Sequence, residues 1–431
     1  MSDVLERVYR VFDPAPLEVD QDDLYVDLDE VRGEAGLVNR LATRIRLSER
    51  PTCQLLTGHH GSGKSTELKR LQRELENGDK RFFVVFCEAR SDLDLNDVDF
   101  PEVLIAIVHQ LAKQLKDRAD IKLEPGYFKN RWERLKDLLG SEVDFEGLEL
   151  GAGMVKIAGV IKSSPDARAE IRKAMEPDTG NLLYAANDVI GKATLELGKN
   201  GFHGLVILVD DLDKMVLRPH LVAGCSTAEY LFINRHKQLS AFECHVVYSM
   251  PLALAYSAQE QTIETLYGAQ VPVIPMTKVA QRPPRRSVHK PGMDRFREVI
   301  SARLKKAGVE EANVFETEKV RDRLIRLSGG QPRELMILTR EAIIGGGLPI
   351  KEPAVNRAER EGRRAYARQL RDEHWSLIDK VRNKGSLKRT QANDDLVREL
   401  LDSRAILQYL NEEEWYGVNP LIAVPTSRKA K

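Results

Sequence analysis

The sequence has few cysteines, and none of them are closely spaced. Cys53, Cys87, Cys225 and Cys244 are spread over 431 residues, and no C-x-x-C motif occurs. A chain of this length can bury a core without disulfides, so we expect four reduced thiols, as in a cytosolic protein. The nine histidines form no H-x-x-x-H motif and no cluster with cysteine, which argues against a structural zinc site.

Net charge and long apolar runs are also absent. Lys plus Arg and Asp plus Glu both number 66, so the formal net charge is zero and any basic surface must be local. No run approaches the roughly 18 apolar residues of a membrane span, and MSDVLERVYR lacks the apolar core of a signal peptide. These absences predict a soluble, cytoplasmic protein with no membrane partner.

A phosphate-binding loop is the strongest signal that is present. The segment TGHHGSGKST (residues 57–66) fits G-x-x-x-x-G-K-[ST], between a strand-like QLLT and a helix-like ELKRLQREL. Glycines let backbone N–H groups surround a phosphate, the lysine reaches the β- and γ-phosphates, and the next hydroxyl serves Mg²⁺. The alternative is a glycine-rich turn before an ordinary helix. The pattern predicts nucleotide binding by Gly58, Gly61, Ser62, Gly63, Lys64, Ser65 and Thr66, with Ser65 as a metal ligand.

A second signal is the stretch GLVILVDDLD, residues 204–213. Its apolar residues predict a buried strand that ends in carboxylates. Such acids can hold the Mg²⁺ water shell and polarise an attacking water, and we assign the metal role to Asp210 and the catalytic base to Asp211. A buried strand followed by an acidic turn is the alternative.

The remaining pattern predicts an α/β fold with a doubly wound parallel sheet. RFFVVFC (residues 81–87) is an unalternated apolar run, as in a strand covered on both faces. Asp99 and Glu102 form a capping box before an amphipathic helix over about 101–117. A further strand ends at Ser249, which we expect either to sense the γ-phosphate or to be a satisfied hydroxyl in a turn. QVPVI (residues 270–274) is the expected last strand.

The chain divides into four predicted parts. We expect the acidic start to be a strap with few buried contacts, and Arg32-Gly33-Glu34 to be either an adenine contact or a surface turn. The insert carries a possible β-hairpin over 145–162 and a long helix over 165–197, and we expect it to fold on the core rather than bind a partner or a membrane. The parts are a strap (1–30), a core (31–280) with an insert (about 120–200), a basic linker and helical lid (281–350), and a C-terminal domain (351–431).

The lid contains SGGQPREL, which places Pro332 at the first position of a helix and Arg333 in its first turn. An arginine held there can reach the γ-phosphate. Before it, the stretch from Gln281 to Lys306 is basic and opens with QRPPRR, which predicts an exposed linker.

Together these motifs resemble the AAA+/STAND branch of P-loop NTPases, over about residues 30–425. The resemblance implies ATP and Mg²⁺ as ligands, a sensor 2 role for Arg333, and a C-terminal winged helix like that of origin-recognition ATPases. Two departures imply slow hydrolysis. No arginine occurs between Pro251 and Gln281, where a ring ATPase carries its arginine finger, and Asp211 stands where the base is usually Glu.

Two functions follow from the resemblance. The first is an ATP-controlled switch, a slow ATPase that relays its nucleotide state to a protein partner. The second is a DNA-binding ATPase of the replication-initiator or transposition-regulator type, which a group of basic residues supports and Glu412, Glu413 and Glu414 at the wing tip oppose. A catalytically inactive nucleotide-binding scaffold and a homo-oligomer also stay open. The basic residues are Lys380, Arg382, Lys384, Lys388 and Arg389, together with those of the basic stretch 282–306.

Overall fold

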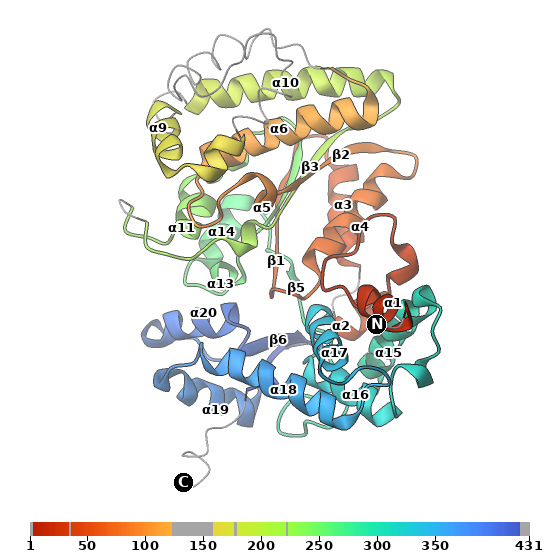
Figure 1. Cartoon of the computed structure of the whole chain (residues 1–431). Helices are drawn as coiled ribbons and strands as arrows, with labels where there is room; N and C mark the ends of the chain where they lie inside the picture. Colours follow the sequence, from red (N-terminus) through yellow and green to blue (C-terminus); the bar gives the residue numbers. More distant parts are fainter. Residues whose placement is uncertain (1–2, 34–35, 123–157, 176–178, 221–222, 423–431) are drawn as a thin grey trace.

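A computed structural model describes residues 3–33, 36–122, 158–175, 179–220 and 223–422. Most of the predicted hairpin over 145–162 lies outside these ranges. Figure 1 shows a central sheet flanked by helices, with a second layer of C-terminal helices against the edge where the strands end. Within the described ranges, no helix combines the length and the apolar character that crossing a membrane requires.

The sheet is parallel, as the buried apolar runs predict. Its strand order is β2-β3-β4-β1-β5. Since β1 lies between β4 and β5, the loop after β1 opens at the carboxyl edge of the sheet, where ligands of open α/β sheets bind. This arrangement confirms the predicted fold class. The bounds are β1 Cys53–Gly58, β2 Phe82–Glu88, β3 Gly204–Asp210, β4 His245–Ser249 and β5 Val273–Ile274.

Helices cover both faces of this sheet. Val206 and Leu208 of β3 pack with α3 (Leu37–Leu47) and α4 (Lys64–Glu76) on one face. The alternate residues of β3 belong to the core on the other face, with α6 (Phe100–Ala119) and α10 (Thr179–Lys199). The predicted capping box of Asp99 and Glu102 is present at the start of α6. The expected helix over 165–197 is described as α9 (Pro165–Met175) and α10.

The acidic start of the chain is more than a strap, and that prediction was wrong. Helix α1 (Asp3–Val11) packs on α15 (Lys290–Ala307), and Val8 and Phe12 are fully buried. Further along, Leu24 and Leu28 are buried as well. The acidic composition hid these apolar side chains, which are widely spaced in the sequence.

The basic stretch is also only partly a linker. Its first residues, 281–286, are mostly exposed, but Lys290–Ala307 is helix α15 of the lid. Arg297 pairs with Asp322 at 2.6 Å, and Arg303 is buried. Acids outside the stretch therefore neutralise part of its charge. The lid continues with α16 (Glu318–Leu327) and α17 (Pro332–Gly346).

The C-terminal unit, residues 352–422, contains the expected helices and two-stranded ribbon; its identity as a winged helix stays a prediction. Helix α18 packs on α17. The ribbon contacts both the core, where Met276 N donates to Gln408 O at 3.0 Å, and the lid, where Tyr409 Oη donates to Gly329 O at 2.7 Å. The elements are α18 Glu352–Ala367, α19 Trp375–Lys384, α20 Asp394–Asp402, and antiparallel β6 Ile406–Leu410 and β7 Glu414–Val418.

Short helical segments complete the fold. The helical stretch from Thr227 to Leu239 is interrupted by a π-helical turn, Tyr230–Asn234. The others include η1 Asp22–Leu24, α2 Asp29–Arg32, α5 Ala89–Asp92, η3 Leu212–Lys214, α11 Thr227–Glu229, α12 His236–Leu239, α13 Leu252–Ala255, α14 Glu260–Tyr267, η5 Glu311–Asn313, η6 Asp372–His374 and η7 Gln391–Asn393.

Candidate nucleotide-binding site

The predicted phosphate loop connects β1 to α4 in an open turn. Gly61 and Gly63 have φ angles of 83° and 107°, a backbone conformation that residues other than glycine rarely adopt. A Cβ on Gly63 would also lie 2.9 Å from Arg32 Nη2. The first amides of α4, including those of Lys64 and Ser65, have no intrahelical acceptor, so this helix end is suited to an anion.

Arg32 holds the loop in this shape. Its guanidinium donates to Ser62 O and to Glu67 Oε1, both at 2.7 Å, and the residue is only 4% exposed. The interpretation of Arg32 as part of a surface turn is therefore wrong. Arg32 therefore holds Ser62 of the loop in a fixed position relative to Glu67 in the first turn of α4.

Lys64 is bound to the protein itself. Its ammonium donates to Gly58 O at 2.7 Å and to His59 O at 2.9 Å, and lies 2.9 Å from Asp213 Oδ2. Burial alone would raise the pKa of Asp213, but the nearby charges of Lys64 and His60 outweigh it and lower that pKa. The lysine that the motif assigns to phosphate thus has a buried carboxylate partner, to which the sequence analysis gave no role.

Asp213 belongs to a cluster with Asp210 and Asp211, whose carboxylate oxygens lie within 4.8 Å of one another. The pKa of Asp210 is raised to about 6 by burial and by the two neighbouring carboxylates, while a hydrogen bond from Ser65 opposes the shift. Asp210 Oδ1 is buried and has no hydrogen-bond partner among the described residues. Hard oxygen ligands gathered beside a hydroxyl fit Mg²⁺, as predicted for Ser65 and Asp210.

The side chains of Asp211 and Ser249 both contact other residues of the protein. Asp211 has a φ of 69°, and its carboxylate pairs with Arg90 Nε at 3.1 Å and with Lys214. Ser249 is fully buried next to the acidic turn, and its hydroxyl accepts the Asp213 N–H at 3.4 Å. The structure brings both side chains to the site, each already held by another residue.

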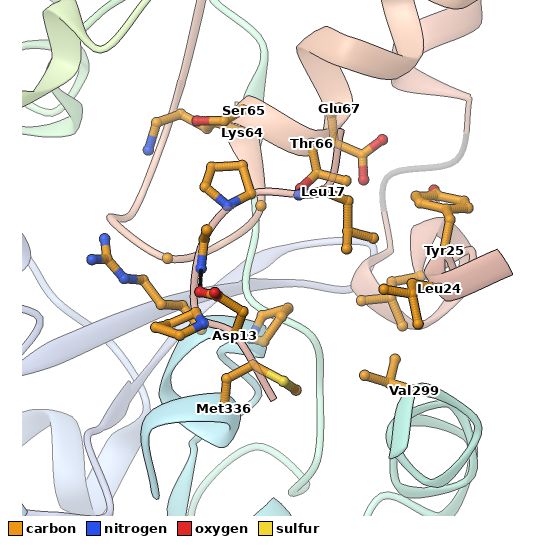
Figure 2. Close-up of a pocket in the computed structure, with 18 of the residues that line it drawn as sticks. Asp13, Leu17, Leu24, Tyr25, Lys64, Ser65, Thr66, Glu67, Val299 and Met336 are labelled. Atoms are coloured by element: carbon orange, nitrogen blue, oxygen red, sulfur yellow. Dashed lines mark hydrogen bonds between the residues drawn. The ribbon is translucent and has the colours of Figure 1, made fainter. Parts of the chain in front are cut away.

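A cavity of about 370 Å³ opens beside the loop. Its walls come from the phosphate loop, from the N-terminal segment 13–28, and from helices α15 and α17 of the lid. Leu17 N donates to Thr66 Oγ1 at 3.3 Å, which joins the N-terminal segment to α4. Figure 2 shows Leu24, Val299 and Met336 on the side of the cavity away from Lys64 and Ser65, so one end is apolar and the other polar.

Arg333 lines the same cavity. It stands in the first turn of α17, as predicted, and a Cβ built on Gly61 would lie 3.1 Å from its Cβ. Its side chain is exposed, and no hydrogen bond or ion pair to another described residue holds it. The lid arginine and the phosphate loop therefore lie side by side.

The two histidines of the loop, to which the sequence analysis gave no function, contact the C-terminal unit. His59 is 1% exposed; Gln408 N donates to its Nε2 at 2.9 Å, and its Nδ1 lies 3.2 Å from Leu401 O. Burial, with the charge of Lys64, lowers the pKa of His59 to about 3. His60 lies between Asp213, at 3.5 Å, and Asp402 of α20, at 3.6 Å.

The parallel sheet, the phosphate loop after its central strand and the acidic end of a neighbouring strand define a P-loop nucleotide-binding fold. No protein-family model and no curated protein matches the chain. Solved structures do. A Walker-type ATPase of Pyrococcus abyssi is 14% identical with a TM-score of 0.46, covering 95% of this chain and 98% of that one.

Two further solved structures match over a similar extent. The ORC2 protein of Aeropyrum pernix, solved as ADPNP and ADP complexes, is 13% identical with a TM-score of 0.42, over 97% of this chain and 95% of that one. CDC6P of Pyrobaculum aerophilum is 12% identical with a TM-score of 0.38, over 96% and 94%. All three matches extend along almost the whole length of this chain.

Proposed function

We propose that this chain is an ATP-binding, slowly hydrolysing molecular switch of the AAA+/STAND type. One observation carries the proposal: the cavity beside Lys64 is built by the phosphate loop, the N-terminal segment and the lid together, and the same loop is hydrogen-bonded to the C-terminal unit through His59. A ligand that fills this cavity contacts parts of the chain that are far apart in sequence, so it can change how they pack.

The polar end of the cavity suits a triphosphate. The free amides of α4, the ammonium of Lys64 and the side chain of Arg333 supply donors and positive charge. Ser65 and Asp210 would hold Mg²⁺, which supplies charge neutralisation of the phosphates when bound. Lys64 must then leave Asp213, so nucleotide binding exchanges one partner of this buried ammonium for another.

Slow hydrolysis follows from the state of the acids. Asp211, the proposed base, is neutralised by Arg90 and Lys214 and is available to an attacking water only after these pairs open. Ser249 accepts the Asp213 amide but keeps its own O–H to donate, so what limits its contact with a water or a phosphate is its complete burial. Arg333 has no such constraint, which supports its role as the lid group that senses the γ-phosphate.

The relay passes through the loop histidines. His59 joins the phosphate loop to α20 and β6, and His60 lies between an acid of the site and an acid of α20. A shift of the loop on nucleotide binding cannot preserve all of these contacts. The C-terminal unit would then loosen or move, exposing a surface to a separate protein partner.

The DNA-binding alternative is less well supported. Glu414, at the start of β7, accepts from Tyr256 Oη and packs the ribbon onto the core. Two of the basic residues predicted to contact phosphates are paired, Arg382 with Asp379 and Arg389 with Glu260. The exposed cations that remain are Lys380, Lys384 and Lys388, together with Arg282, Arg285 and Arg286 of the linker. Arg282 lies 3.6 Å from Glu413, so acids of the ribbon stand beside these cations and oppose a phosphate-binding face.

Hydrogen exchange tests the switch. We expect Mg²⁺-ATP to slow exchange in the phosphate loop and to change exchange in the peptide containing Gln408, whose amide is bonded to His59. The variant His59→Phe removes both hydrogen bonds and should bind ATP while losing the response at Gln408. Binding of ATP to the unaltered chain with no change in the C-terminal unit would refute the relay.

A further inference from the structure

Arg303, on the wall of the nucleotide cavity, is a buried cation without a counter-charge. It is 6% exposed, its Nη1 donates to Val299 O at 3.2 Å, and its Nε is enclosed with no acceptor. In the described part of the chain, no carboxylate lies within ion-pair distance of it. Burial lowers the pKa of Arg303 to about 10, so the side chain stays charged at neutral pH.

Other buried arginines of the chain are paired. Arg32 has Glu67, and Arg321 of the lid has Glu311 and Asp322. A buried charge without a partner is unfavourable, and an enclosed donor without an acceptor is rare in folded proteins. A bound ligand that presents a hydrogen-bond acceptor to Arg303 would satisfy its Nε–H.

The position of Arg303 in the cavity indicates which part of the ligand carries this acceptor. It follows Val299 by one turn of α15, and Figure 2 shows Val299 and Leu24 on the side of the cavity away from Lys64 and Ser65. The phosphates are expected at the lysine, so the apolar end is left for the nucleoside. A flat heteroaromatic base fits between aliphatic side chains and presents ring nitrogens or carbonyl oxygens as acceptors.

We propose that Arg303 is a specificity-determining residue that donates hydrogen bonds to acceptor atoms on the nucleoside end of the bound nucleotide. The guanidinium carries donors only, so it favours ligand edges that present acceptors. This inference rests on the proposed function, since it requires a nucleotide in the cavity beside Lys64. It adds a residue that distinguishes a nucleotide from a bare polyphosphate.

The test compares two ligands, Mg²⁺-ATP and Mg²⁺-tripolyphosphate, by calorimetric titration into the full chain and into Arg303→Met. Tripolyphosphate has no base or ribose. We expect the variant to bind ATP about tenfold or more weakly, and tripolyphosphate within about twofold of the unaltered chain, because one charge-assisted interaction is lost at the nucleoside end. Equal losses for both ligands, or undiminished ATP affinity, would overturn the proposal.

Thermal unfolding separates this role from a structural one. Removing an unpaired buried charge should leave the melting temperature of the nucleotide-free protein unchanged or raise it, while reducing the shift that ATP produces. The control Arg321→Met removes a paired lid arginine outside the cavity and should lower the melting temperature instead. A lower melting temperature for Arg303→Met, with an unchanged ATP shift, would show Arg303 to be structural. If the unaltered chain binds neither ligand, the proposed function itself fails.

Discussion

His59 of the phosphate loop and Gln408 of the C-terminal ribbon are 349 residues apart and share a hydrogen bond of 2.9 Å. The ring nitrogen accepts the Gln408 N–H, so this nitrogen carries no proton, while the other ring nitrogen faces the carbonyl of Leu401. The contact with Gln408 requires a neutral imidazole whose single proton is on Nδ1, where it can be donated to Leu401 O. The loop that is expected to hold phosphate is therefore fastened to a distant part of the chain by a group that must not be charged.

This geometry predicts a pH dependence. The pKa of His59 is about 3 in the folded chain, below its ordinary value of 6.5, so its contribution to stability is complete above pH 6.5 and is lost as the pH falls. Between pH 7 and pH 5 this loss is about 2 kcal/mol. Urea unfolding of the nucleotide-free protein at both pH values measures it. His59→Gln keeps a donor and an acceptor without titrating, and should lose correspondingly less stability; an unchanged difference would contradict the assignment.

The buried pair of Lys64 and Asp213 predicts a large effect of a small substitution. Asp213→Asn leaves the ammonium without its charged partner, and both side chains are at most 5% exposed. We expect the free energy of unfolding of the nucleotide-free protein to fall by about 3 kcal/mol.

The control for this substitution is Asp211→Asn, two residues away. Its partners Arg90 and Lys214 are more exposed, so the loss should stay below about 1 kcal/mol. Denaturant unfolding of the two variants side by side makes the comparison. Similar losses of unfolding free energy in the two variants would mean that the ion pair between Lys64 and Asp213 does not stabilise the protein as a buried pair should.

Arg32 provides a test of the loop's shape. Arg32→Met leaves Ser62 O without its donor and Glu67 with one fewer partner in a buried position, and should cost about 3 kcal/mol of stability together with at least tenfold in ATP affinity. The matched variant is Arg46→Met. It removes a partly exposed ion pair between Arg46 of α3 and Glu74 of α4, and should cost about 1 kcal/mol of stability or less with unchanged ATP affinity. Unaltered ATP binding by a folded Arg32→Met protein would show that the clamp is dispensable.

Much of this site could be predicted because its signals are local. The phosphate loop, the strand ending at Asp210 and the helix start at Pro332 each depend on neighbouring residues and on buried apolar runs. The parallel sheet follows from the same runs, since strands covered on both faces have few polar positions.

The remaining parts of the site depend on long-range packing. Asp213 follows Asp210 by three residues, which is only a weak indication in the sequence that it belongs to the site. Its pairing with Lys64, and the hydrogen bond between Gln408 and His59, join segments that are far apart in the sequence and that no periodic pattern relates. The buried contacts of residues 1–30 were missed because a few apolar side chains lie among many acids. Arg303 was hidden in a basic stretch, where composition predicts exposure and the amphipathic face of α15 determines burial.

The central claim is that a triphosphate binds between Lys64 and the acids that end β3, and calorimetric titration with Mg²⁺-ATP tests it most directly. Lys64→Ala would leave Asp213 buried without its partner, so the double variant Lys64→Met with Asp213→Asn is measured beside it to keep the protein folded. We predict saturable binding by the unaltered chain and a loss of about a hundredfold or more in both variants. A folded variant that binds ATP as tightly as the unaltered chain would contradict the account.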